Sequence, residues 1–278
     1  RFAPSEALIF RGNWSTSFRA PSMAQAGAGT LLSSYRVDCT VTPEACGGDA
    51  SADGEALLSE DVGNQNLRPE QAETYGFGML FRPTKDIELN VDYWNIRHED
   101  LVGIDEDDFI RRALAGDFPV VGEGELATGI AGVEVNGGFV TDAHFQLTNL
   151  GFQKTSGLDI AYTQYMDIGG GTLSFLFDLT YLFNFDRKSS VNAPVVEEAG
   201  EFRYPEILAN AKLRYRHDNW RVSLSANYTD SYKDDPSPRV LEAVGLPDDA
   251  IVTIPSWTVF NASFGYDLDD ATTLQLNV

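Results

Sequence analysis

Apolar and polar residues alternate along one short stretch of the chain, from residue 173 to residue 185. Leucine, phenylalanine or tyrosine fills all seven odd positions, whereas Ser174, Asp178, Thr180 and Asn184 fill four of the six even ones. Successive side chains of a β-strand leave opposite faces of the backbone. A period of two over thirteen residues therefore predicts a strand with one apolar face, from Leu173 to Phe185.

The same alternation recurs along the chain and predicts nine strands in all. The strands are expected at residues 6–17, 72–82, 87–93, 144–166, 173–185, 207–215, 220–228, 260–268 and 274–278. Their links alternate between short ones, such as Arg82–Asp86 and His217–Asn219, and long polar stretches. The short links contain Pro, Asp or Asn, which favour tight turns. The long stretches cover about residues 19–71, 98–143, 187–203 and 229–254.

This strict alternation of short and long links favours an antiparallel, up-and-down transmembrane β-barrel. Such barrels have short periplasmic turns, long extracellular loops and girdles of aromatic residues around the apolar band. Aromatic residues end several of the predicted apolar faces, and the opposite faces are polar, as Lys212, Arg214 and Arg221 show. A soluble sandwich would also alternate, but nothing would place its long loops at one end. No run of 18 apolar residues occurs, which excludes a transmembrane helix.

One helix is expected inside the second long stretch. Asp105–Asp108 supplies acidic capping residues, and Phe109, Ile110, Ala113 and Leu114 share one face. Gly116 is expected to end the helix.

The net charge of the chain bears on which classes of molecule it can bind. The chain has 20 basic and 42 acidic residues, a net charge of −22, which argues against a nucleic acid. We also expect a fragment of a longer protein, because Arg1 follows no signal peptide and Val278 lies within a strand pattern.

Cys39 and Cys46 are the two cysteines, and they lie in a polar region rich in Gly and Asp. A local disulfide in an oxidising compartment such as the periplasm or the cell surface is the preferred interpretation. A zinc site is the alternative, although no histidine precedes His98.

Three motifs resemble those of the TonB-dependent outer-membrane receptors. The segment Trp14–Pro21 is similar to the family's "gFRAP" segment, and Asn66–Glu70, followed by Glu73, is similar to its "NLkPE…sE" segment. The family's closing strands resemble residues 254–257, 261–266 and 274–278, and Lys154–Asp159 is a weaker match to its "kGvE" segment.

The resemblance implies a 22-stranded barrel with a plugged lumen. Residues 1–278 would form a partial C-terminal β-barrel domain of about nine strands, without the plug domain, the early strands and the last strand. It further implies a transporter rather than an enzyme, located in the bacterial outer membrane. The cargo would be a scarce nutrient, such as an iron chelate, cobalamin or an oligosaccharide. The expected partners are outer-membrane lipid, the nutrient, and the TonB energising complex, gripped through the missing N-terminal region. A passive porin, or a surface adhesin without energy coupling, is the alternative.

One loop segment resembles a calcium-binding loop. Residues 49–60 fit the spacing D-x-[DN]-x-[DN]-G-x5-E with one departure, and the ligands would be Asp49, Ser51, Asp53, the Glu55 carbonyl and Glu60. No other cofactor is expected. An acidic, solvated surface loop is the alternative, because the segment is not preceded by a helix.

Other candidate chemistry is sparse. The acidic pairs and runs in the loops either attract cations or serve solubility: Glu99–Asp100, Asp105–Asp108, Asp234–Asp235 and Asp248–Asp249. Four loop aromatics could stack on a sugar or an aromatic chelate: Tyr35, Phe118, Phe139 and Tyr232. Catalysis is not predicted, because His98, His144 and His217 lie far apart in the sequence and no catalytic motif is present.

Overall fold

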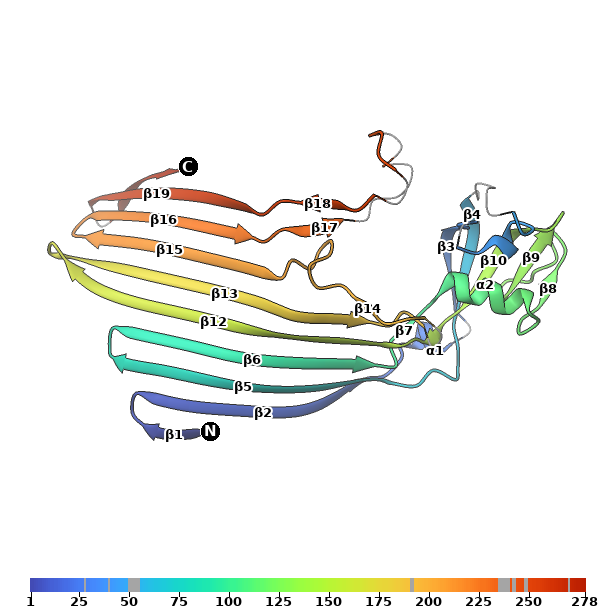
Figure 1. The fold of residues 1–278 in the computed structure, drawn as a ribbon, viewed down its shortest axis with the longest axis horizontal. Helices are drawn as coiled ribbons and strands as arrows, with labels where there is room; N and C mark the ends of the chain where they lie inside the picture. Colours follow the sequence, from blue (N-terminus) through green and yellow to red (C-terminus); the bar gives the residue numbers. More distant parts are fainter. Residues whose placement is uncertain are drawn as a thin grey trace.

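The computed structural model describes residues 1–27, 29–39, 41–49, 56–190, 193–234, 241, 244–247, 250–269 and 271–278. The protein consists of a large, curved antiparallel sheet and a smaller folded subdomain beyond one end of it (Figure 1). In the part of the chain that is described, no helix is long and apolar enough to cross a membrane.

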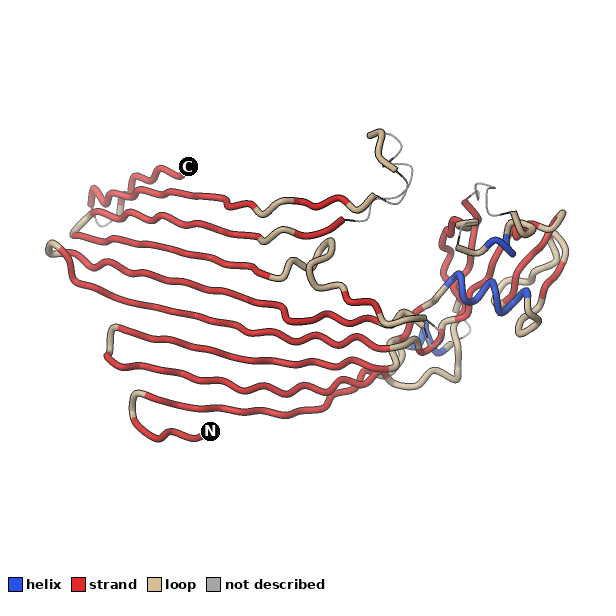
Figure 2. The backbone as a smooth tube through the Cα atoms, in the orientation of Figure 1, coloured by secondary structure: helices blue, strands red, loops and turns tan. Residues whose placement is uncertain are grey.

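The large sheet is an up-and-down meander, in which each main strand pairs with the next one along the sheet. Its order is β1-β2-β5-β6-β12-β13-β15-β16-β19-β20, and the sheet is open (Figure 2). The bounds are β1 (Phe2–Ser5), β2 (Leu8–Arg19), β5 (Glu70–Thr84), β6 (Ile87–Glu99), β12 (Phe152–Ile168), β13 (Gly171–Arg187), β15 (Ile207–His217), β16 (Trp220–Thr229), β19 (Trp257–Asp269) and β20 (Thr272–Asn277). The two-residue β14 (Val196–Glu197) pairs with the end of β13.

All nine predicted strands are present, and β1 is an additional strand that the sequence pattern did not predict. Its four residues include Pro4 and pair with β2 through an irregular register. Four residues are too few to establish a period of two in the sequence. These residues form a strand because they pair with β2.

The short links that are described in full are two-residue turns, and they gather at one end of the sheet (Figure 1). Gly169 and Gly170, between β12 and β13, have φ angles of 60° and 84°. A type I′ turn requires positive φ at both central residues, which glycine adopts without steric cost. Asp218, in the turn between β15 and β16, has a φ of 46°. The long links all leave the opposite end, so the predicted division into a turn end and a loop end is confirmed.

The two faces of the sheet differ as the alternation predicts, except at the end of β13. There the register shifts between Leu182, opposite Gly157, and Asn184, opposite Ser156, so the predicted odd-numbered apolar face is wrong at Phe185, which is buried against Tyr204. Register aligns Phe77, Tyr93 and Leu158 on the apolar face, and continues to Tyr181 of β13. On the polar face, Thr180 donates a hydrogen bond to Asp159 at 2.7 Å. Asp178 and Thr180 therefore lie opposite the odd-numbered residues of β13, as expected.

Aromatic side chains mark both ends of the apolar face. Towards the loop end, Tyr93 contacts Tyr75 and Phe183 at ring-centroid distances of 6.3 and 6.2 Å. Towards the turn end, Trp220 meets Phe264 and Tyr266, each at 5.2 Å. Two such girdles are typical of strands that cross a bilayer.

The long stretches 19–71 and 98–143, predicted as polar loops, fold together into the subdomain. Its sheet has the order β3-β4-β10-β9-β8: β3 (Thr30–Arg36), β4 (Ala56–Val62), β10 (Phe139–Gln146), β9 (Gly132–Asn136) and β8 (Val120–Val121). The short helices α1 (Met23–Ala26) and η1 (Pro43–Ala45) belong to the first stretch. Two smaller pairings are β7 (Val102–Gly103) with β11 (Thr148–Asn149), and β17 (Tyr232–Asp234) with β18 (Val252–Ile254).

The helix α2 (Glu106–Leu114) confirms the predicted one. Asp105 is its N-cap and accepts a hydrogen bond from the Asp108 backbone at 3.0 Å. Gly116, just beyond the helix, has a φ of 101°. The predicted strand 144–166 is wrong at its start, because His144 belongs to β10 and the long strand begins at Phe152.

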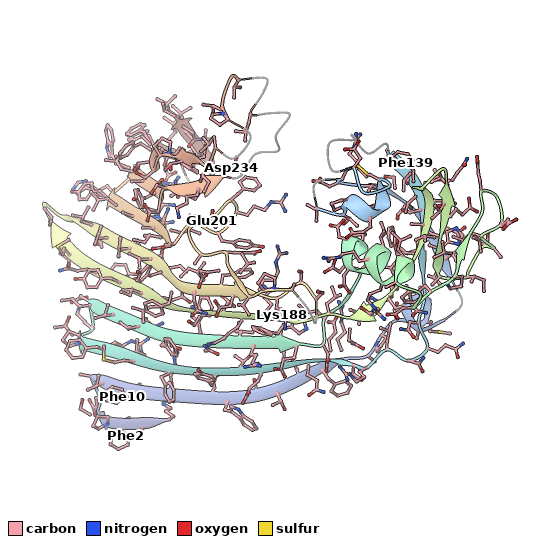
Figure 3. The ribbon with its side chains drawn as sticks, turned by 45° about the vertical axis from the view of Figure 1, so that its right-hand side comes forward. Phe2, Phe10, Phe139, Lys188, Glu201 and Asp234 are labelled. Atoms are coloured by element: carbon pink, nitrogen blue, oxygen red, sulfur yellow. A yellow bond between two sulfur atoms is a disulfide. The ribbon has the colours of Figure 1, made fainter. Side chains whose placement is uncertain are left out.

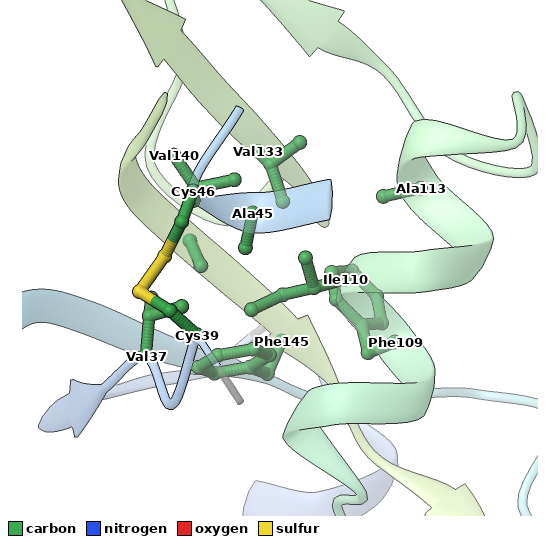
Figure 4. Packing of buried hydrophobic residues seen from close by; sticks show 11 residues of the cluster. Val37, Cys39, Ala45, Cys46, Phe109, Ile110, Ala113, Val133, Val140 and Phe145 are labelled. Atoms are coloured by element: carbon green, nitrogen blue, oxygen red, sulfur yellow. A yellow bond between two sulfur atoms is a disulfide. The ribbon is translucent and has the colours of Figure 1, made fainter. Parts of the chain in front are cut away.

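The subdomain has a hydrophobic core of its own, between α2 and the five-stranded sheet. Phe145 of β10 contacts Tyr35 and Phe109 edge to face, at 5.3 and 5.4 Å between ring centroids. A disulfide joins Cys39 to Cys46 at the border of this core (Figure 4). The remaining members are small or aliphatic: Val37, Ala45, Ile110, Ala113, Val133, Val140 and Ala143.

Candidate functional site

A hollow of about 600 Å³ lies at the loop end, beside the end of β13. Its size is within the range of pockets that hold small ligands. It is built from the link between β13 and β15 together with β17. The lining residues are Arg187, Val196, Glu197, Glu198, Glu201, Phe202, Arg203, Tyr204, Lys233, Asp234 and Ile251.

Aromatic rings form the frame of this loop-end hollow. Tyr204 stacks on Phe185, near the end of β13, with 4.2 Å between ring centroids and 18° between planes. Phe202 lies 6.1 Å from Tyr232, which in turn meets Trp257 at 6.0 Å. The rings tie the link to three different strands, so the hollow is fixed to the rigid sheet. Glu201 forms an isolated β-bridge with Lys233, the residue before Asp234, and Figure 3 labels Glu201 and Asp234 near each other.

Both signs of charge line the same hollow. Arg187 forms an ion pair with Glu198 at 2.5 Å, and the Lys233 ammonium lies 3.8 Å from Glu201. Arg203 adopts a φ of 77° and places its guanidinium 5.2 Å from the Phe202 ring centre. Aromatic faces and guanidinium groups together suit a planar or oxygen-rich ligand.

A second hollow, of about 520 Å³, lies at the turn end and is lined largely by the polar face. Lys212, Arg214, Arg216 and Arg221 line it, and Arg221 is paired with Asp267 at 2.5 Å. The predicted lumen cations Lys212, Arg214 and Arg221 are thus brought together. Arg216 shares their alternation and could have been predicted with them.

Glu70 joins the subdomain to the sheet. Its side chain is 2% exposed, and its carboxylate accepts a hydrogen bond from Arg19 at 2.5 Å and another from the Val102 backbone at 2.9 Å. The His98 ring lies 3.2 Å from the second carboxylate oxygen. The motif Asn66–Glu70 ends on this residue, but the sequence assigned it no contacts, because Arg19, His98 and Val102 are distant from it in the sequence.

The four candidate stacking aromatics have different surroundings. Tyr35 packs on Phe145 and donates a hydrogen bond to Asp107 at 2.5 Å, and Phe118 packs on Phe109 at 4.4 Å. These two belong to the subdomain interior. Phe139 is exposed on the subdomain (Figure 3), and Tyr232 stands beside the loop-end hollow. Phe202 and Tyr204 were missed, although two aromatics around an arginine are a visible signal.

The acidic run Asp105–Asp108 serves the subdomain itself. Asp105 caps α2, and Asp107 accepts hydrogen bonds from Tyr35 and from Thr42, the latter at 2.8 Å. Burial, together with the hydrogen bond to Asp107, raises the pKa of the Tyr35 hydroxyl. Burial also raises the pKa of Glu106, and the nearby carboxylates of Asp107, Asp105 and Asp61 act in the same direction.

The predicted calcium loop falls largely outside the described residues, since Ser51, Asp53 and Glu55 are among those left out. Asp49 and Glu60 are described, and Glu60 accepts a hydrogen bond from the Gly129 backbone at 3.2 Å. Among the described residues, no cluster of three or more His, Cys, Asp or Glu is arranged to hold a metal ion. Calcium binding stays a prediction.

Comparison with known proteins identifies the relatives of this chain. The family model described as the β-barrel of TonB-dependent receptors matches residues 1–278. No curated protein matches the sequence.

Among solved structures, the siderophore receptor PirA from Acinetobacter baumannii is similar, with a TM-score of 0.62 and 14% identity over 99% of this chain and 35% of that one. A variant of the ferric enterobactin receptor PfeA from Pseudomonas aeruginosa, in complex with enterobactin, has a TM-score of 0.61 and 12% identity over 99% and 33%. The FrpB iron transporter from Neisseria meningitidis has a TM-score of 0.51 and 12% identity over 96% and 31%. The chain spans about a third of the length of the receptors it matches.

Proposed function

Because the chain belongs to the TonB-dependent receptor family, we propose that it is a barrel segment of an active importer for a scarce nutrient. Proteins of this family are transport receptors of the bacterial outer membrane rather than enzymes. The family match along all 278 residues carries the proposal. The order of the sheet, the two girdles and the loop-end hollow support it.

An iron chelate is the cargo class that we favour over cobalamin or an oligosaccharide. The structural neighbours are described as siderophore receptors, a ferric enterobactin receptor and an iron transporter. The loop-end hollow offers the aromatic rings and cations that an aromatic, oxygen-rich chelator would contact. The wall of this hollow includes Tyr204, Phe202 and Arg203.

Energy coupling would come from the TonB complex, through an N-terminal plug and its partner-binding box outside residues 1–278. The porin alternative requires no plug and no energy source. Its uptake would follow the concentration gradient, so the two functions differ in what stops transport.

Uptake of radioactive iron by the native host tests this proposal. The experiment compares cells that carry the full-length gene with a deletion strain, in iron-poor medium supplied with ferric catecholate. We expect uptake that depends on the gene and is lost in a strain without TonB. Gene-dependent uptake that persists without TonB would support the porin.

Tyr204→Ala tests the ligand site itself. We expect it to raise the chelate concentration needed for half-maximal uptake roughly tenfold, as loss of one aromatic contact of about 1.4 kcal/mol would do. Phe139→Ala, exposed on the subdomain, is the matched control and should leave uptake unchanged. Equal effects of the two substitutions would show that the loop-end hollow is not the ligand site.

A further inference from the structure

β13 contains one extra residue near its loop end. Leu182 pairs with Gly157 of β12. The next pair joins Asn184 to Ser156, so Phe183 has no partner on β12. Two residues of one strand that oppose a single residue of the next form a β-bulge. The pairing of β12 with β6 is regular through the same segment, so the irregularity belongs to β13.

The bulge reverses the face on which the odd-numbered residues of β13 lie. Before the bulge, Tyr181 pairs with Leu158 on the apolar face. Beyond it, Phe185 pairs with Thr155, which lies on the polar face because it is an odd number of positions from Leu158. Arg187 follows Phe185 on the same face. Without the extra residue, the side chains of Phe185 and Arg187 would both lie on the apolar face.

These two side chains take part in the loop-end hollow. Phe185 is 7% exposed and stacks on Tyr204, and its backbone N–H donates a hydrogen bond to the Glu197 carboxylate at 2.7 Å. Arg187 lines the hollow and forms the ion pair with Glu198. β13 also changes its neighbour at the bulge, from β15 to β14. The link that builds the hollow therefore leaves the sheet where the bulge lies.

Gly157 makes room for the bulge. A Cβ atom at this position would lie 2.5 Å from Trp94 Cζ2 and 2.7 Å from the Tyr181 carbonyl oxygen, closer than Cβ atoms approach other heavy atoms. Glycine within a strand often marks a bulge or such a close approach. Beside it, the Ser156 hydroxyl donates a hydrogen bond to the Asn184 side chain across the bulge. Any larger residue at position 157 would force the two strands or the indole ring to move.

We propose that the bulge at Phe183, accommodated by Gly157, is the positioning element of the loop-end ligand site. The inference rests on the proposed function, in which this hollow receives the iron chelate. A regular register would turn Phe185 towards lipid and separate Arg187 from the Glu198 carboxylate, which is only 12% exposed. Bulges next to binding sites re-aim side chains in this way. One additional backbone residue thus brings an aromatic ring and a cation of β13 into the site.

Deletion of Phe183 from the full-length receptor tests the role of the extra residue, and Phe183→Ala is the matched control. Both variants lack the phenyl ring, but only the deletion removes the bulge. The added substitutions Phe185→Cys and Tyr204→Cys report whether the hollow forms, because a short bifunctional thiol reagent joins these positions only when they lie on the same face. We expect the cross-link with Phe183 and with Phe183→Ala, and none in the deletion. A cross-link that persists in the deletion, or that both variants lose, would overturn the proposal.

Gly157→Ala provides a second test that does not depend on whether the deletion variant assembles. The added methyl group should displace the bulge and lower the yield of the same cross-link severalfold. Gly12→Ala, in β2, is its control, because the nearest atom to the new Cβ would lie 3.5 Å away. Equal cross-linking in the two alanine variants would contradict the role of Gly157 and of the bulge that it accommodates.

Uptake of ferric catecholate, measured without the cysteine substitutions, separates this inference from the proposed function. Deletion of Phe183 should raise the concentration needed for half-maximal uptake at least about tenfold, and Phe183→Ala should leave it unchanged. Unchanged uptake in a deletion variant that has lost the cross-link would overturn the inference, because the hollow would then not be the ligand site. If the unaltered receptor imports no chelate, the proposed function fails, while the cross-links still decide whether the bulge builds the hollow.

Discussion

The sheet and the subdomain differ in where they place their apolar side chains. Of the 14 apolar residues that are buried among the described ones, 11 form the core of the subdomain. In the sheet, Trp14, Phe77 and Phe260 are 67, 66 and 75% exposed. The subdomain therefore has its own hydrophobic core, whereas the apolar face of the sheet is exposed and suits contact with lipid.

This difference reflects two kinds of surroundings. An open sheet with such an exposed apolar face would aggregate in water, and a bilayer removes that liability. The subdomain lies beyond the loop end, outside the apolar band, so it must stabilise itself as a small soluble protein does. Its disulfide is a common means of doing so in an oxidising compartment.

The largest expected effect is a cavity in the subdomain core. Phe145 is 1% exposed, so Phe145→Ala should destabilise the subdomain by about 3–5 kcal/mol. Hydrogen exchange of the full-length receptor should show faster exchange in β3, β4 and β10 and unchanged exchange in β12 and β13. Phe139→Ala, at an exposed position, serves as the control. Faster exchange throughout the sheet would contradict two separately stabilised regions.

A charge on the apolar face tests the other half of the comparison. Leu179→Arg, in the middle of β13, should destabilise the folded barrel by about 2–4 kcal/mol, because the guanidinium would face lipid. Thr180→Arg, one residue further along the strand, should cost much less because it faces the polar side. Unfolding by urea in lipid vesicles measures both. If Thr180→Arg were the more damaging, the assignment of the faces would be reversed.

Reduction of the disulfide should affect the subdomain alone. The bridge closes a short segment, since its cysteines are seven positions apart. The double variant Cys39→Ser and Cys46→Ser should lose about 2–3 kcal/mol of subdomain stability. Limited proteolysis with and without reductant reports it, with the double variant as the reference that reductant cannot change. Cleavage within the sheet strands would show that the two regions are coupled.

The smallest effect concerns a partly buried carboxyl group. The pKa of Glu106 is raised in the folded protein, so folding favours the protonated carboxyl group. The stability that the protonated group contributes is lost as pH rises through the folded-state pKa, where the carboxylate becomes charged. Glu106→Gln should therefore stabilise the subdomain at pH 7, by less than about 1 kcal/mol because solvent screens part of the charge. The gain should vanish near pH 4. A pH-independent difference would exclude protonation as its cause.

The sequence predicts the strands of the large sheet better than those of the subdomain, and the reason is physical. Strands such as β13 have one apolar and one polar face, so the sequence of the strand itself shows the alternation. Turn residues such as Gly169 and Gly170 show where these strands end. The central subdomain strands β9 and β10 are buried on both faces over part of their length, as Ala143, His144 and Phe145 of β10 illustrate. β10 also pairs with a strand more than 80 positions away, as Ala143 does with Ser59, and no local pattern reveals such a partner.

The same contrast holds for the sites. Lys212, Arg214 and Arg221 could be assigned to the lumen from the alternation alone. The loop-end hollow and the Glu70 junction depend on contacts between links that are distant in the sequence. Local capping signals are the exception, and α2 was predicted from them correctly.

The central claim is that, from Leu173 to Phe183, the odd-numbered face of β13 meets lipid and the even-numbered face meets the lumen; beyond Phe183 the register shifts. Spin labels placed one at a time at positions 173 to 183 of the full-length receptor in a bilayer test it most directly. The labels' collision rates with oxygen and with a water-soluble nickel complex are then compared at each position. We predict a period of two, with oxygen favoured at odd positions and nickel at even ones. Equal nickel access on both faces, or the reverse phase, would contradict the account.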